Sequence, residues 1–557
     1  MATILSYSPQ GIIDKALFNF DAMGSTDFKL SGPIAVSVSE PFVYFQYLSG
    51  QGSNATWTPD VSAVYWNQTQ IANINLILNI YKQFINVSFS TVADYTNYSP
   101  LGVGIFTSSD INISLIYRTD LPWSGQSSLN LNSYAYVGSE LDVVLNDAKF
   151  GTSDYSLSTT SFGGHALMHE LGHSLGLSHP FYPIATAVTA DYSATTTVGF
   201  NKLGFVINGA GDMNKEYFSI MSYDNEKPLN SVDTYAQTPM ILDVIALQDA
   251  YGAGGGSSGT GNDVITPGSS SGLNSYRTYF DTGGIDTINL VNYATGVYLH
   301  MGTSIVGASH LVGVSMSISD YQLMVSSGSP QSLRWFYGEF ENAIGSTGTD
   351  LIIGNDLNNV ITATSGNDTI DGGGGIDTVI FGAKSSDFTR NLGTQTIVVD
   401  NTLNRYSREV FTNIERLQFT DTNIALDIAS TQTAGEAYLL YQAAFNRHPD
   451  TPGVGYWIAT LDAGMNIVTV TQAFINSPEF IGLYGANPSV SNYVNLLYQN
   501  VLHRAGEAGG VNYWNGQLNN NIFSRAQVLE YFAASPENVA AVAPDIAHGI
   551  AYQQWVV

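Results

Sequence analysis

Residues 169–179 read HELGHSLGLSH and place three histidines in an order that one metal ion can gather. On an α-helix, residues four apart lie on one face, so His169 and His173 can both reach a single ion. Gly176 lets the backbone leave the helix, and the following turn can bring His179 back as a third ligand. Three protein ligands leave one coordination position open, which is typical of a catalytic zinc site rather than a structural one.

The helix that carries these residues is predicted over 162–177, and two more of its residues need an interpretation. Glu170 lies beside the helical ligands, near enough to accept a proton from metal-bound water without binding the ion. His165 lies one turn before His169, but a straight trio of histidines would spread over about 12 Å of helix axis, too far for one tetrahedral ion. We therefore interpret Glu170 as a general base and His165 as a structural residue or a support for the ligands.

Downstream, residues 219–223 read SIMSY, and the two motifs together resemble those of metzincin proteases, in particular the serralysin family. In that family a methionine turn of this form underlies the zinc, and a tyrosine two residues after the methionine reaches the metal. The resemblance gives these roles to Met221 and Tyr223, and it implies one catalytic Zn²⁺. It continues through PMILDVIALQDAYGA and the glycine-rich segments, and so covers about residues 160–430.

From Gly345 the sequence divides every nine residues into GSTGTDLII, GNDLNNVIT, ATSGNDTID and GGGGIDTVI. This pattern is typical of a parallel β-roll, in which each glycine-rich loop offers carbonyls and a carboxylate and each short strand buries an aliphatic residue. Loops two repeats apart stack, so Asp350 should share an ion with Asp368, and Asn359 with Asp377. Such oxygen ligands suit Ca²⁺. The second repeat has leucine and asparagine where glycine and aspartate are expected, so its site should be weaker.

Two earlier loops, GTGND at 259–263 and TGGID at 282–286, have the same G-x-D core and lie where serralysins bind further calcium ions. The other interpretation of any single loop of this kind is an ordinary turn rich in Gly, Asn and Asp. The predicted calcium residues are Asp263, Asp286, Gly345, Gly348, Asp350, Asn359, Gly366, Asp368, Gly372, Gly375 and Asp377.

A chain of 557 residues is too long for one ordinary core, and the predicted fold class is multidomain α+β. Residues 1–252 are predicted to form a metzincin zinc-protease domain, whose first few dozen residues are either part of it or a short propeptide. A run of Gly and Ser at 252–261 then opens the predicted RTX β-roll domain, 253–430, an all-β parallel roll or sandwich. Residues 431–557 are predicted to be all α.

Several local elements are predicted within the first domain. A helix is expected over 71–84, and another begins with Thr238 as N-cap and Pro239 in the first turn and ends before Gly252. Strands are predicted for VSFSTV at 87–92, GVGIFT at 102–107 and LDVVLN at 141–146.

The C-terminal block contains an internal repeat with a period of about 57 residues. Arg447 recurs as Arg504, Tyr-Trp at 456–457 recurs at 513–514, and Ser-Pro-Glu at 477–479 recurs at 535–537. One helical unit has therefore been duplicated. The block resembles a helical domain of unknown function found behind such repeats in secreted bacterial proteins. Its Tyr-Trp pairs are interpreted as core aromatics, with a carbohydrate- or partner-binding surface as the alternative.

Composition limits the partners. The net charge of −28 argues against nucleic acid or anionic lipid as the main partner. Bound cations would neutralise part of this carboxylate excess. The other interpretation is a solvated acidic surface. The absence of cysteine excludes disulfides, thiolate metal sites and a cysteine nucleophile. No stretch of about 18 apolar residues predicts a transmembrane segment.

The first residues have no basic segment followed by an apolar run and a cleavage site, so no N-terminal signal peptide is expected. Proteins with such repeats usually leave bacteria by type I export and fold outside the cell as calcium binds. The resemblance therefore implies a secreted protein that meets the type I secretion machinery. The final residues YQQWVV depart from the acidic ending of serralysins, so the export signal itself is not carried over.

Together these features predict a secreted, calcium-dependent zinc metalloendopeptidase that hydrolyses protein or peptide substrates. Two alternatives stay open. One is a calcium-stabilised surface or adhesion protein with a vestigial protease domain. The other is a protease dedicated to one surface-layer or co-secreted partner, with the C-terminal domain docked on a cell-surface component.

Overall fold

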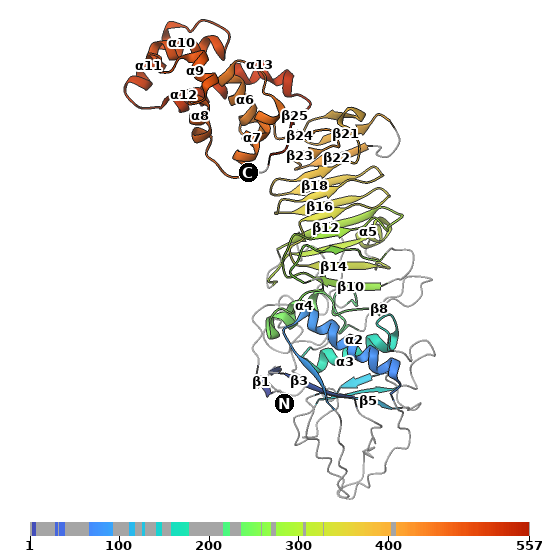
Figure 1. The fold of residues 1–557 in the computed structure, drawn as a ribbon. Helices are drawn as coiled ribbons and strands as arrows, with labels where there is room; N and C mark the ends of the chain where they lie inside the picture. The colour runs from blue at the N-terminus through green and yellow to red at the C-terminus, as the bar shows by residue number, and fades with distance from the viewer. Residues whose placement is uncertain are drawn as a thin grey trace, which may run out of the picture. The chain divides into compact units, whose positions relative to one another are not determined.

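The computed structural model describes residues 3–6, 28–31, 33–38, 66–92, 111–116, 125–127, 141–146, 157–177, 215–222, 235–257, 259–268, 275–304, 308–326, 328–402 and 408–555. The chain divides into two compact units, Met1–Phe340 and Glu341–Val557 (Figure 1). This boundary falls inside 253–430, and the division into three domains stays a prediction. Among the described residues, no helix has both the length and the apolar character of a membrane span.

The N-terminal part of the first unit contains a five-stranded sheet. Its strands are parallel except for the edge strand β6, which runs antiparallel to β7. The predicted strands at 87–92 and 141–146 are confirmed as β4 and β7, and 102–107 lies outside the described residues. Across the sheet the order is β4 (Phe89–Val92), β3 (Ile34–Val38), β5 (Ile111–Ile116), β7 (Leu141–Asn146) and β6 (Gly125–Ser127), and a separate antiparallel pair joins β1 (Thr3–Ser6) to β2 (Phe28–Ser31).

Helix α2 (Gln68–Phe84) begins three residues earlier than predicted. The reason is a capping box: the Asn67 side chain accepts the Gln70 N–H at 2.9 Å, and the Gln70 side chain accepts the Asn67 N–H at 2.9 Å. These polar residues precede the apolar pattern on which the prediction relied. The buried Tyr81 hydroxyl donates to the Met168 carbonyl at 2.5 Å, so α2 is joined to the helix of the histidine motif.

Helix α3 (Phe162–Ser174) carries that motif and contacts β6 and β7. Helix α4 (Ile241–Tyr251) ends before Gly252 as predicted, where φ is +78°. The predicted N-cap of α4 is wrong, because the cap is Met240, whose N–H donates to Asp243 at 2.8 Å. Thr238 instead accepts the Thr278 N–H at 2.8 Å, which ties it to a strand 40 residues away.

The rest of the first unit is mainly β-structure. The prediction of an all-β segment over 253–430 is wrong at one place, where α5 (Ile318–Val325) forms because the Ser317 hydroxyl caps the Asp320 N–H at 3.1 Å. One sheet contains β12 (Val297–Thr303), β13 (Val312–Ser317), β14 (Leu333–Tyr337), β10 (Ser275–Phe280) and β8 (Tyr235–Ala236), and β9 (Val264–Ile265) pairs in parallel with β11 (Thr287–Asn289).

The second unit opens with the nine-residue repeats, whose strands alternate between two sheets (Figure 1). Ile352 is opposite Ile370, and Ile361 is opposite Val379, so parallel strands pair at a spacing of two repeats, as predicted. All four side chains are buried. One sheet is β16 (Leu351–Asn355), β18 (Thr369–Gly373), β22 (Arg408–Thr412), β21 (Thr396–Asp400) and β20 (Phe388–Asn391). The other is β15 (Asn342–Ile344), β17 (Val360–Thr362), β19 (Thr378–Ile380), β23 (Arg416–Gln418), β24 (Asn423–Ala425) and β25 (Ile550–Tyr552).

The helical part contains two sets of four helices, in which equivalent ion pairs recur. Arg447 binds Glu479 and Arg504 binds Glu537, each with a closest N–O distance of 2.7 Å. The first four-helix set is α6 (Thr433–Phe445), α7 (Thr451–Asp462), α8 (Ile467–Ile475) and α9 (Pro478–Tyr484), and the second set is α10 (Val490–Asn500), α11 (Ala508–Asn519), α12 (Arg525–Ala533) and α13 (Pro536–Ile546).

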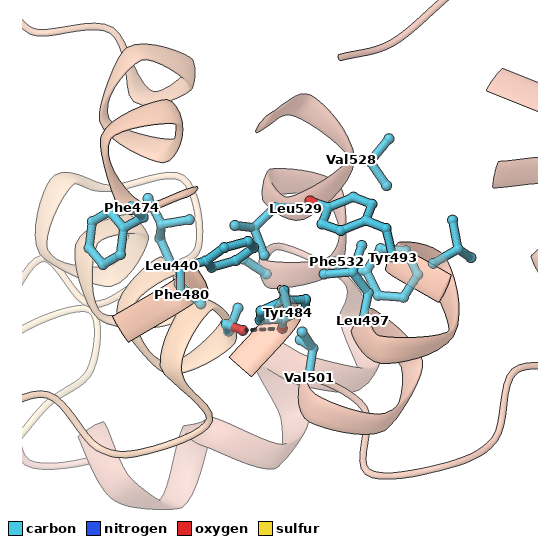
Figure 2. Close-up of a cluster of buried hydrophobic side chains, with 14 of the residues drawn as sticks. Leu440, Phe474, Phe480, Tyr484, Tyr493, Leu497, Val501, Val528, Leu529 and Phe532 are labelled. Atoms are coloured by element: carbon cyan, nitrogen blue, oxygen red, sulfur yellow. Dashed lines mark hydrogen bonds between the residues drawn. The ribbon is translucent and has the colours of Figure 1, made fainter. Parts of the chain in front are cut away.

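The two four-helix sets share one core. Figure 2 shows Phe474 and Tyr484 from the first set in the same cluster as Tyr493 and Phe532 from the second set. The two tryptophans of the Tyr-Trp pairs pack against this core, as the core interpretation predicted. Their neighbours are exposed, Tyr456 by 40% and Tyr513 by 53%. Each pair therefore has one ring inside and one ring outside.

Candidate metal centre

His169 and His173 lie next to each other on α3, with ring centroids 4.9 Å apart, and both are buried. The Nδ1 atom of His169 is 2.8 Å from the Ile220 carbonyl, and that of His173 is 2.7 Å from the Leu177 carbonyl. A carbonyl oxygen only accepts, so each Nδ1 carries the proton, and in the neutral ring each Nε2 offers a lone pair to a metal. Burial lowers the pKa of His169 to about 4, so this ring is neutral near pH 7.

The chain leaves α3 at Gly176, where φ is +106°. The Leu177 N–H then donates to the Gly172 carbonyl at 3.0 Å, which closes the C-terminal turn. A side chain at Gly176 would be strained in this conformation, so glycine is needed to redirect the backbone here. The predicted third ligand His179 and the predicted oxyanion residue Tyr223 both lie outside the described residues.

Met221 is fully buried beneath this helix. A Cβ added at Gly172 would lie 2.7 Å from the Met221 Sδ, so the methionine packs against the α3 backbone midway between Glu170 and Ser174. The role that the resemblance gives to Met221, beneath the zinc, stays a prediction.

Asp243 holds this turn in place from α4. Its carboxylate is inaccessible to solvent and accepts hydrogen bonds from the Ser219 hydroxyl at 2.6 Å, the Ile220 N–H at 2.7 Å and the Met240 N–H at 2.8 Å. The carbonyl of the same residue, Ile220, accepts the hydrogen bond from His169 Nδ1. Burial raises the pKa of Asp243 to about 6, against the effect of the three donors. Asp243 thus orients His169 through a single intervening residue.

His165 supports α3 from the same side. Its Nδ1 is 3.3 Å from a carboxylate oxygen of Glu216, and that oxygen accepts the Ala236 N–H at 2.7 Å. Burial lowers the pKa of His165 to about 4. The His165 ring centroid is 6.5 Å from that of His169. These contacts join α3 to the segment before the methionine turn and to β8.

The donor set fits zinc. Two buried imidazoles lie on one helix face, and each Nδ1–H is held by a carbonyl, which is the arrangement that orients a histidine ligand. Glu170 is also buried, on the same helix turn as His169.

A second group of side chains that could hold a metal ion lies near the start of the β-structure. One carboxylate oxygen from each of Asp263, Asp281 and Asp286 lies within 4.8 Å of the others. The Asp263 N–H also donates to Asp286 at 2.7 Å. A Cβ at Gly284 would be 2.2 Å from the Gly261 carbonyl, so the two loops approach so closely that only glycine fits. The predicted pair, Asp263 and Asp286, is therefore brought together with a third carboxylate.

The residues at the sixth position of the repeats stack in the predicted pairs. The Asp350 N–H donates to Asp368 Oδ1 at 2.9 Å, and the Asn359 N–H donates to Asp377 Oδ1 at 2.8 Å. Burial raises the pKa of Asp368 and of Asp377 to about 7. Buried carboxylates of this kind are stabilised as anions by a cation.

The repeat glycines leave room for these carboxylates. A Cβ at Gly345 would be 2.7 Å from Asp350, one at Gly366 would be 2.7 Å from Asp368, and one at Gly372 would be 2.3 Å from Asp377. Gly348 and Gly375 provide the facing loop backbone: the Gly348 carbonyl would be 2.3 Å from a Cβ at Gly366, and Gly375 has a φ of +100°. Asn359 uses its amide to donate to the Glu341 carbonyl at 3.1 Å.

Comparison with known proteins finds serralysins among the relatives of this chain. The serralysin of Proteus mirabilis is 28% identical over 312 residues, which are 53% of this chain and 56% of that protein. Serralysin C of Dickeya chrysanthemi is 28% identical over 325 residues, 56% of this chain and 58% of that protein. The metallopeptidase AprA of Pseudomonas marginalis is 29% identical over 219 residues, 36% of this chain and 39% of that protein. The chain is a distant relative of the serralysins.

This serralysin relative spans a little more than half the length of the first two of these proteins. Its residues 471–542 match a different family model, described as a domain of unknown function, DUF4214. That match lies within the duplicated helices.

Two residues of the serralysin relative were missed by reasoning from sequence. Asp281 has a signal, since the stretch DTGGID places a second carboxylate five residues before Asp286. Asp243 has a weaker one, as an acidic residue in an otherwise apolar helix. Neither signal identifies the distant partners, because Asp263 lies 18 residues before Asp281 and Ser219 lies 24 residues before Asp243.

Proposed function

We propose that this serralysin relative is a secreted, calcium-stabilised zinc metalloendopeptidase with a metzincin catalytic domain. The observation that carries the proposal is the pair of buried imidazoles whose Nδ1 protons are fixed by the Ile220 and Leu177 carbonyls. His169, His173 and His179 would hold the zinc ion. Bound zinc supplies Lewis-acid activation of water and of a carbonyl group.

The residues of the chain then have distinct tasks. Glu170 takes the proton from the attacking water and returns it to the departing amine. Tyr223 donates a hydrogen bond to the oxyanion that forms at the scissile carbonyl. Met221 and Asp243 keep the turn against α3, so that His169 stays oriented while substrate binds. Protein or peptide chains outside the cell are the proposed substrates.

Calcium has a structural task in this proposal. Several Ca²⁺ ions would bind the carboxylates and loop carbonyls of the repeats and of the Asp263–Asp286 loops. A ligand that binds only the folded state stabilises it by RT ln(1 + [L]/Kd), which is large where calcium is plentiful and small where it is scarce. Folding would therefore be favoured outside the cell, after type I export.

The test is a casein digestion combined with elemental analysis of the purified full chain. Glu170→Gln should keep one zinc per chain and lose about 10²–10⁴-fold in cleavage rate. Glu339→Gln, a change at an exposed glutamate, is the matched control and should cleave like the wild type. A wild-type protein without zinc, or a Glu170→Gln variant with normal turnover, would overturn the proposal.

A further inference from the structure

Two glutamates outside the nine-residue repeats continue the register of the repeat carboxylates. The Thr369 N–H donates to the Asp350 carbonyl at 2.9 Å, and the Val410 N–H donates to the Asp368 carbonyl at 2.9 Å. Glu409, the residue before Val410, therefore follows Asp350 and Asp368 on the third strand in line.

The other sheet repeats this arrangement. The Thr378 N–H donates to the Asn359 carbonyl at 2.8 Å, and the Arg416 N–H donates to the Asp377 carbonyl at 2.9 Å. Glu415, the residue before Arg416, therefore follows Asn359 and Asp377.

The glutamate carboxylates also accept the same hydrogen bonds as the aspartates one rung earlier. The Asp368 N–H donates to Glu409 at 3.2 Å, as the Asp350 N–H donates to Asp368. The Asp377 N–H donates to Glu415 at 2.9 Å, as the Asn359 N–H donates to Asp377. Each glutamate thus occupies the place of a repeat aspartate, although neither belongs to a glycine-rich repeat.

Two buried carboxylate oxygens are placed where a cation could bind. Glu409 and Asp377 are inaccessible to solvent, and among the described residues Glu409 Oε1 and Asp377 Oδ2 have no hydrogen-bond partner. The charged neighbours acting on Glu409 are Asp368 and Asp350, both acidic. Carboxylates that are buried beside one another are costly to keep as anions, and a positive ion between them would remove much of that cost.

A loop carbonyl completes the donor set in the second sheet. A Cβ at Gly354 would lie 2.0 Å from the Gly372 carbonyl, and a Cβ at Gly372 would lie 2.1 Å from the Asn413 carbonyl. Asn413 has a φ of +50°, a left-handed conformation that asparagine tolerates. Its carbonyl therefore takes the position that a repeat glycine carbonyl takes one rung earlier.

We propose that Glu409 and Glu415 are calcium ligands that extend the ladder of sites by one rung beyond the repeats, with one ion between Asp368 and Glu409 and one between Asp377 and Glu415. The inference rests on the proposed calcium binding by the repeats. Carboxylate and carbonyl oxygens at this density suit Ca²⁺ better than zinc or other softer ions.

The test is calcium titration of the full chain by isothermal calorimetry after dialysis against EGTA. Glu409→Gln and Glu415→Gln should each lose one Ca²⁺ per chain, and the double variant should lose two. Glu436→Gln, at a partly buried glutamate on α6, is the matched control and should bind as the wild type. Circular dichroism in saturating calcium checks that each variant is folded. Should a glutamine variant not fold, Glu409→Asp, which keeps the charge but shortens its reach, should bind the terminal ion at least about tenfold more weakly.

A second readout separates ligation from a merely structural role. In EGTA, Glu409→Gln should melt at a higher temperature than the wild type, because it removes one of several facing carboxylates. On addition of calcium it should gain less than the wild type. Unchanged stoichiometry and affinity in the glutamate variants, with normal binding by the wild type, would overturn the terminal sites alone. A folded wild type that binds no calcium would instead overturn the proposed calcium binding of the repeats.

Discussion

Asp243→Ala is the substitution that most directly tests how the candidate metal centre is held together. The change removes one acceptor from three buried donors: the Ser219 hydroxyl, the Ile220 N–H and the Met240 N–H. The hydroxyl can rotate to another acceptor, but the two backbone N–H groups cannot. A buried donor left without a partner costs about 1–3 kcal/mol, so the expected loss of stability is about 2–6 kcal/mol.

The same substitution should weaken zinc binding, because Ile220 is both the donor to Asp243 and the acceptor for His169. Loss of a group that orients a metal ligand typically costs about 10–100-fold in metal affinity. Competition with a chromogenic chelator measures that affinity. Hydrogen exchange of peptides over 215–222 and 236–251 measures the protection of the Ile220 and Met240 amides.

Asp243→Asn is the matched control, since its amide oxygen can still accept from the two backbone N–H groups while its amino group faces the Ser219 oxygen. It should lose less stability and less zinc affinity than the alanine variant. If Asp243→Ala kept the wild-type exchange rates and zinc affinity, the carboxylate would not be what holds the turn, and the reasoning would be refuted.

Two further predictions concern the second unit. Arg416→Met leaves the buried Asp427 and the partly buried Asp462 without their shared guanidinium, so a loss of about 3–5 kcal/mol is expected in urea unfolding, and a loss below about 1 kcal/mol would contradict it. In EGTA, the raised pKa values of Asp368 and Asp377, about 7, and of Glu409, about 9, mean that the folded state binds these protons more tightly than the unfolded state. The stability that these protonated carboxyl groups contribute is complete below their unfolded pKa values of about 4 and is lost as the pH rises to about 9. The melting temperature should therefore fall over that pH range in EGTA and fall much less in calcium. A melting temperature that rose with pH in EGTA would show that the carboxylates are not buried together.

Features with a short period could be predicted from the sequence because the period itself determines the geometry. Residues four apart share a helix face, so His169 and His173 had to lie together once a helix formed. A nine-residue repeat that alternates between two sheets had to place Ile352 opposite Ile370. Gly176 was also predictable, since only glycine adopts its φ of +106° without strain.

Only the tertiary structure decided which distant groups meet. Thr238 looked like a helix cap, but its hydroxyl is taken by a strand 40 residues later. Asp243 reaches the Ile220 peptide 23 residues earlier, and Glu409 reaches Asp368 across 41 residues. Such pairs depend on how long connections close and on which strand lies next in a sheet. Local periodicity does not determine which connection closes or which strands pair, because the free energy that selects these arrangements comes from burial and pairing in the assembled fold.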